Sequence, residues 1–147
     1  MDPEVVGKLG TVVTRIRGVA ADLLGDAGVA ATVDAPDEVA ALRLSAEARR
    51  HLYLIVKESL TNVVRHAHAT SVAIQFAAHE RGLRCTIEDD GVGSATEKPA
   101  AETGGRGLAS MRARAAAAGG TLVIGSAPGV GTRIELWLPR AALTAVR

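Results

Sequence analysis

Two runs of alternating residues constrain the fold of this 147-residue chain more than any other feature. In residues 71–77, and again in residues 83–88, every second side chain is a large apolar one or cysteine. A period of two residues is typical of a strand that buries one face. Because Arg81-Gly82 supplies a turn between the runs, they are predicted to pair as a β-hairpin.

Helical patterns lie on both sides of this hairpin. Ser45 is predicted to cap a long helix that runs to about Ala67, and a second helix is predicted over residues 106–118, ended by Gly119-Gly120. Further strands are predicted at residues 29–33, 121–126 and 132–138. Together these elements predict an α/β (α+β) two-layer sandwich, with helices on one face of a mixed, mostly antiparallel sheet.

The first 28 residues carry an amphipathic pattern of their own. In residues 3–25 the apolar positions follow steps of four and three, which suits one stripe of a helix or a coiled-coil seam. Two interpretations stay open: a helix packed on its own domain, or the end of a dimerising stalk. The predicted division is a helix in residues 1–28, the main domain in 29–140 and a C-terminal tail in 141–147.

Composition excludes several classes of partner. The formal net charge of +1 offers no general attraction to nucleic acid or anionic lipid, and 2% aromatic residues leave little for base stacking. A single cysteine, Cys85, excludes an internal disulfide. No apolar run reaches the roughly 20 residues that span a bilayer, and the N-terminus does not resemble a signal peptide. The chain is expected to be cytoplasmic, without nucleic-acid or direct membrane contact.

The long predicted helix carries a polar face near its end. Glu58 and Asn62 lie one turn apart, and Arg65 and His66 follow at steps of three and four. Carboxylate and amide oxygens suit Mg²⁺, and the basic groups could face a phosphate tail. The alternative is a solvated face with an ion pair between Glu58 and Arg65.

Two glycine-containing segments follow. Asp89-Asp-Gly91-Val-Gly93 ends a strand with a carboxylate that could accept a hydrogen bond from a ring amine, while the glycines let the backbone pass close to a flat base. A plain turn is the alternative. Gly104-Gly-Arg-Gly107 opens a helix whose free amides could bind an anion, or it only hinges a loop. Between these segments, residues 94–104 are predicted to form a mobile loop.

Other kinds of site lack their signatures. The chain has no P-loop, and its glycines do not form a dinucleotide-binding turn after a strand. The histidines lack zinc-ligand spacing and cysteine partners. His51, His68 and His79 are predicted to be surface residues.

These three polar segments, in this order and followed by Gly131-Thr132, resemble the ATP-binding catalytic domain of sensor histidine kinases. The wider fold, the Bergerat-type ATP-binding fold, is shared with gyrase, heat-shock protein 90 and MutL. Residues 52–58, 62–67, 105–111 and Gly119-Gly120 are similar to the nitrate-sensor-type subgroup. The resemblance covers residues 29–139.

The resemblance implies ATP and Mg²⁺ as cofactors, with Asn62 and Glu58 as the catalytic residues. Asn62 would ligate Mg²⁺ through its amide oxygen, and Glu58 would orient a metal-bound water or polarise the incoming nucleophile. Arg65 and His66 would face the phosphates.

The remaining matched positions would hold the nucleotide. Asp89 would accept a hydrogen bond from the adenine amine, and Thr132 would support Asp89. The backbone around ATP would be formed at the positions Gly91, Gly93, Gly105, Gly107 and Leu108. Asp90 stands where many relatives have asparagine, a change expected to be tolerated.

The resemblance also implies partners. Sensor kinases phosphorylate a histidine on separate dimerisation helices, and no segment here matches that motif. The chain is expected to bind ATP and Mg²⁺ without autophosphorylating, and to serve the dimerisation helices of a parent kinase and a downstream response regulator. The parent could be a membrane-anchored sensor. The alternatives are a stand-alone anti-sigma-factor serine kinase of the same fold and a non-catalytic nucleotide-sensing adapter.

Overall fold

The computed structural model describes residues 6–91, 105–127 and 130–144. The predictions for Gly93 and for the loop at 94–104 lie outside these residues, as does part of the turn before Gly131.

A five-stranded sheet forms one layer of the molecule, with the strand order β2-β4-β5-β7-β6. The edge strand β2 (Ala30–Asp34) runs parallel to β4 (Ser71–His79). The other neighbours, β5 (Gly82–Asp89), β7 (Gly131–Pro139) and β6 (Thr121–Ala127), pair antiparallel. This topology confirms the predicted hairpin and the mixed, mostly antiparallel sheet.

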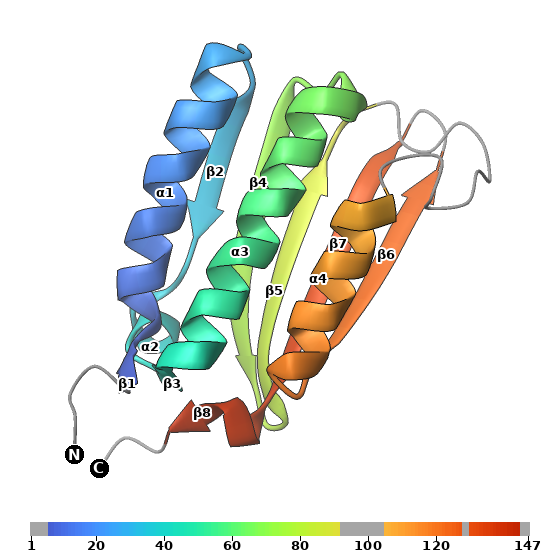
Figure 1. The fold of residues 1–147 in the computed structure, drawn as a ribbon. Coiled ribbons are helices and arrows are strands. Elements are labelled where there is room, and N and C mark those ends of the chain that lie inside the picture. The colour runs from blue at the N-terminus through green and yellow to red at the C-terminus, as the bar shows by residue number, and fades with distance from the viewer. Residues whose placement is uncertain (1–5, 92–104, 128–129, 145–147) are drawn as a thin grey trace.

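Three helices cover one face of this sheet (Figure 1): α1 (Leu9–Asp26), α3 (Ala46–Asn62) and α4 (Gly105–Ala117). The Ser45 hydroxyl caps α3 by accepting the N–H of Ala48 at 3.1 Å, as predicted. The two-layer sandwich is therefore confirmed.

The short elements were not predicted. A second sheet has the order β1-β3-β8, from β1 (Val6–Lys8), β3 (Arg43–Ser45) and β8 (Leu143–Thr144). The helix α2 (Asp37–Ala40) and the 3₁₀ turn η3 (Arg140–Ala142) are equally short. Elements of two to four residues are too short to display a helical or strand period.

The end of the long helix also differs from the prediction. α3 is α-helical only to Asn62, and the π-helix η1 (Val63–Ala67) continues it. In a π-helix the hydrogen bonds join residues i and i+5, so the turn is wider than an α-helical one. Side chains after Asn62 therefore leave the α-helical register on which the prediction relied.

The helix α1 shares the core of the domain. It packs against α3 and β2, and one face is buried: Leu9, Val12, Val13, Ile16, Ala20 and Leu24. These contacts correspond to the first of the two interpretations, a helix packed on its own domain. The division into residues 1–28, 29–140 and 141–147 stays a prediction.

The core lies between the helices and the sheet. β4, β5 and β7 bury alternate residues there: Val72, Ile74, Phe76, Leu83, Cys85, Ile87, Ile134, Leu136 and Leu138. Burial raises the pKa of the Cys85 thiol to about 12, so that thiol stays protonated and unreactive at neutral pH. None of the helices described is both long enough and apolar enough for a membrane crossing.

Candidate functional site

Three segments that are far apart in the sequence meet on one side of the molecule, away from the chain termini (Figure 1). They are the C-terminal end of α3 with Asn62, the C-terminal end of β5 with Asp89, and the N-terminal end of α4 with Gly105. α3 and α4 also pack against each other. The fold thus gathers the three predicted polar segments in one region.

Asp89 is the buried carboxylate of this region, with 7% of its surface exposed. It continues the alternation of Cys85 and Ile87, so it faces the helix-covered side of the sheet. Its Oδ1 accepts the N–H of Gly91 at 2.8 Å and the N–H of Thr132 at 3.4 Å. Such hydrogen bonds offset the cost of burying a charge. Among the described residues, both of these hydrogen bonds reach Oδ1.

Gly131 brings β7 against this carboxylate. Its φ is +108°, and a Cβ at this position would lie 2.0 Å from the carbonyl oxygen of Asp89 and 3.2 Å from Oδ1. The close approach places the next residue, Thr132, within hydrogen-bonding distance of Asp89. Sequence reasoning identified Thr132 and missed the steric requirement at Gly131, which depends on a neighbour more than forty residues away.

Glu58 and Asn62 are half-buried on the last turns of α3. Glu58 lines a hollow of about 190 Å³ between α3 and α4, together with Arg114 and Ser110. Ser59 links the two helices there, because its hydroxyl lies between two acceptors, the Ile55 carbonyl at 2.8 Å and the Met111 sulfur at 3.3 Å, and shares its one proton with them. The helix pair therefore holds the Glu58 backbone in place.

The described residues contain no group of three or more His, Cys, Asp or Glu side chains that could hold a metal ion. The oxygen donors on the last turns of α3 are the Glu58 carboxylate and the Asn62 amide, which are hard ligands of the kind that Mg²⁺ takes. Mg²⁺ keeps several waters and binds through one or two protein oxygens plus substrate phosphates. The Asn62 amide oxygen, half-buried beside the Glu58 turn, suits that role.

Arg65 and His66 lie in the π-helix η1. Arg65 is exposed. The alternative ion pair between Glu58 and Arg65 is absent from the ion pairs of the described residues. Beyond Asn62, α-helical spacing does not predict which side chains share a face.

The glycines of the third segment open α4. Gly105 and Gly107 lie in its first turn, and the helix begins at Gly105, one residue before the predicted start. Leu108 follows, half-buried against the core. The first-turn amides of a helix have no intrahelical acceptor, so this turn is suited to a phosphate.

One of the predicted surface histidines is buried. His51 is only 6% exposed, and its Nε2 lies 3.5 Å from Oε1 of Glu47. The prediction was wrong because position 51 is one turn before Ile55 and belongs to the apolar stripe of α3. His68 and His79 are exposed, as predicted.

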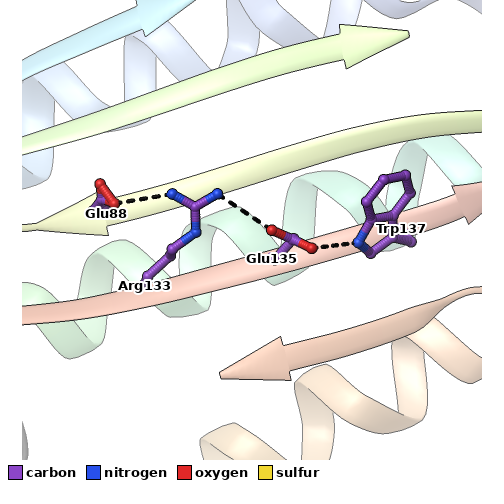
Figure 2. A network of polar contacts seen from close by, with 4 residues as sticks. All are labelled: Glu88, Arg133, Glu135 and Trp137. Atoms are coloured by element: carbon purple, nitrogen blue, oxygen red, sulfur yellow. Dashed lines mark hydrogen bonds and ion pairs between the residues drawn. The ribbon is translucent and has the colours of Figure 1, made fainter. Parts of the chain in front are cut away.

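The uncovered face of the sheet carries a separate polar network. Figure 2 shows Arg133 paired with Glu88 at 3.1 Å and with Glu135 at 3.3 Å, while the Trp137 indole donates to Glu135. The hydrogen bond from Trp137 is the main cause that lowers the pKa of Glu135. Toward its Asp89 end, this face has a hollow of about 610 Å³, and Asp89 itself lines it together with Ala73, Glu88, Gly125 and Arg133.

Comparisons with known proteins identify the family of the chain. The family model of histidine kinase-, DNA gyrase B- and HSP90-like ATPases matches residues 47–142. The chain belongs to this family. The signal transduction histidine-protein kinase/phosphatase UhpB of Salmonella typhimurium is 39% identical over 97 residues, which cover 66% of this chain and 18% of UhpB. The sensor histidine kinase LiaS of Bacillus subtilis is 37% identical over 89 residues, 60% of this chain and 24% of LiaS.

Solved structures share the fold. The ATP-binding domain of PrrB from Mycobacterium tuberculosis has a TM-score of 0.73 at 23% identity, covering 92% of this chain and 96% of that domain. The Acinetobacter baumannii histidine kinase AdeS has a TM-score of 0.73 at 21% identity, covering 91% of this chain and 66% of AdeS. The chain spans about a fifth to a quarter of the two curated relatives. These findings confirm the resemblance to sensor histidine kinases.

Proposed function

We propose that this chain is the catalytic ATP-binding domain of a two-component sensor histidine kinase. It binds ATP with Mg²⁺ and delivers the γ-phosphoryl group to a histidine on separate dimerisation helices. The observation that carries this proposal is the buried Asp89 carboxylate, held by the amides of Gly91 and Thr132 at the end where α3 finishes and α4 begins. The names of the relatives favour a histidine kinase over an anti-sigma-factor serine kinase.

In this mechanism the protein supplies mainly position and charge. Asp89 accepts a hydrogen bond from the adenine amine. The first-turn amides at Gly105 and Gly107 face phosphate oxygens. Asn62 would hold Mg²⁺ together with the nucleotide, and the cation would supply charge neutralisation at the transferred group. Glu58 orients the water or nucleophile beside it. Arg65 and His66 add positive charge toward the phosphates.

The partners follow from the proposed role. The acceptor histidine lies on dimerisation helices of the parent kinase, and a response regulator receives the phosphoryl group afterwards. The reaction takes place in the cytoplasm. Alone, the 147-residue chain binds nucleotide and does not phosphorylate itself.

Asn62→Ala tests the metal role. We expect the wild-type chain to bind ATP more tightly with Mg²⁺ than without it, and the variant to lose about 10-fold of that affinity, or ~1.4 kcal/mol. Titration calorimetry with Mg²⁺ and with a chelator measures both values. Gln75→Ala, an exposed amide on β4, is the matched control and should bind like wild type. A wild-type affinity that ignores Mg²⁺ would show that the metal assignment is wrong.

A further inference from the structure

Asp90 joins the end of β5 to the segment that follows α3. Its Oδ1 accepts the backbone N–H groups of Thr70 at 2.8 Å and of Ser71 at 2.9 Å. Its other oxygen accepts the Thr70 hydroxyl. In return, the Asp90 N–H donates to the Ser71 carbonyl at 3.3 Å. Four hydrogen bonds therefore join Asp90 to the dipeptide Thr70-Ser71.

The dipeptide is the far end of the segment that begins at Asn62. From Asn62 the chain passes through η1 and turns at His68, which has a left-handed φ of 51°. It then reaches Thr70, whose carbonyl also accepts the N–H of Ala30 at 3.0 Å. The segment thus has α3 at one end and Asp90 at the other.

The segment from Asn62 to Thr70 has an unusual backbone, which the hydrogen bonds to Asp90 help to hold. π-Helical turns are rare and frequently lie at functional sites, and a non-glycine residue in the left-handed region carries strain. The hydrogen bonds, chiefly that from the Thr70 hydroxyl, hold the pKa of Asp90 well below its usual range. Asp90 therefore accepts as a carboxylate at neutral pH, which strengthens each hydrogen bond.

We propose that Asp90 is a positioning residue for nucleotide binding, which holds the metal and phosphate side of the site in register with the base side. It is adjacent to Asp89 on one side and bonded to the end of the Asn62 segment on the other. This inference rests on the proposed function and deepens it. Asparagine at this position keeps an Oδ1 for both N–H groups and can donate to the Thr70 hydroxyl oxygen, which explains why it would substitute.

The test compares Asp90→Ala with Asp90→Asn in the full 147-residue chain. Outer-shell partners of metal ligands typically contribute about 10- to 100-fold in metal affinity, which sets the scale for a positioning residue here. We expect Asp90→Ala to weaken Mg²⁺-ATP binding by about 10-fold and adenosine binding by less, because adenosine lacks the phosphates. Asp90→Asn should restore affinity to within about threefold of wild type. Asp34→Ala, an exposed carboxylate at the end of β2, is the control.

Hydrogen exchange of the Thr70 and Ser71 amides reports the contact itself, and should speed up in Asp90→Ala and not in Asp90→Asn. Wild-type affinity retained in Asp90→Ala despite faster exchange would overturn the inference, and so would equal losses in both variants or for both ligands. Failure of the wild-type chain to bind Mg²⁺-ATP would instead refute the proposed function. The two failures are therefore distinguishable.

Discussion

Replacing Gly131 with alanine is expected to abolish ATP binding and to lower the free energy of unfolding by about 2–4 kcal/mol. The φ of +108° is strained for any residue with a Cβ, and that Cβ would lie 2.0 Å from the Asp89 carbonyl oxygen. Relief of the clash requires β7 to move away from β5, which breaks the Thr132 hydrogen bond to Asp89. Urea denaturation and ATP titration measure the two effects.

Gly125→Ala is the matched control for this change. Gly125 lies on the neighbouring strand β6, and a Cβ added there has nothing within 4 Å. The free energy of unfolding of the Gly125→Ala variant should change by about 0.5 kcal/mol or less, as for a surface substitution. The affinity of this variant for ATP should stay the same. A Gly131→Ala variant that behaved like Gly125→Ala would contradict the close packing of β7 on Asp89.

Asp89→Ala should weaken ATP binding by about 1–3 kcal/mol, the cost of leaving a buried polar group without its partner. At 1.4 kcal/mol per factor of ten, this corresponds to roughly 5- to 150-fold. The variant also loses the hydrogen bonds that the Gly91 and Thr132 N–H groups donate to this carboxylate. We therefore expect a lower free energy of unfolding as well. Calorimetric titration and thermal unfolding separate affinity from folding.

Asp89→Asn isolates the contact to the base. An asparagine oxygen can still accept the two backbone amides, but its NH₂ group meets the adenine amine as a second donor. We expect most of the stability to return and most of the affinity loss to remain. Glu88→Gln, the adjacent exposed acid on the opposite face of β5, is the control and should bind ATP normally. Unchanged affinity in both Asp89 variants would remove Asp89 from the site.

The long, periodic elements of the fold were predictable from the sequence. The β4–β5 hairpin and the helices α3 and α4 follow from apolar periods, which record the buried face of each element. The strands β1, β3 and β8 have two or three residues and no period. The π-helical turn after Asn62 has no composition signal, so the register of Arg65 and His66 could not be predicted.

Candidate residues for the site could be named from the sequence where the pattern is local. Glu58 and Asn62 share a helix face, and Asp89 ends a strand beside glycines, so spacing made them candidates. The resemblance to sensor kinases assigned their roles, which stay predictions. Asp90 shows the limit. Its partner Thr70 lies twenty residues away, and local patterns do not report such pairs. Aspartate in place of asparagine at this position was expected only to be tolerated. In the structure, Asp90 joins the end of β5 to the start of β4.

The most direct measurement is a crystal structure of this chain with Mg²⁺ and a non-hydrolysable ATP analogue. The account predicts the adenine amine within hydrogen-bonding distance of Asp89, the cation on the Asn62 amide oxygen and the phosphates at the first turn of α4. A nucleotide whose adenine amine lies out of reach of Asp89, and whose phosphates and cation lie away from Asn62 and the first turn of α4, would contradict the account.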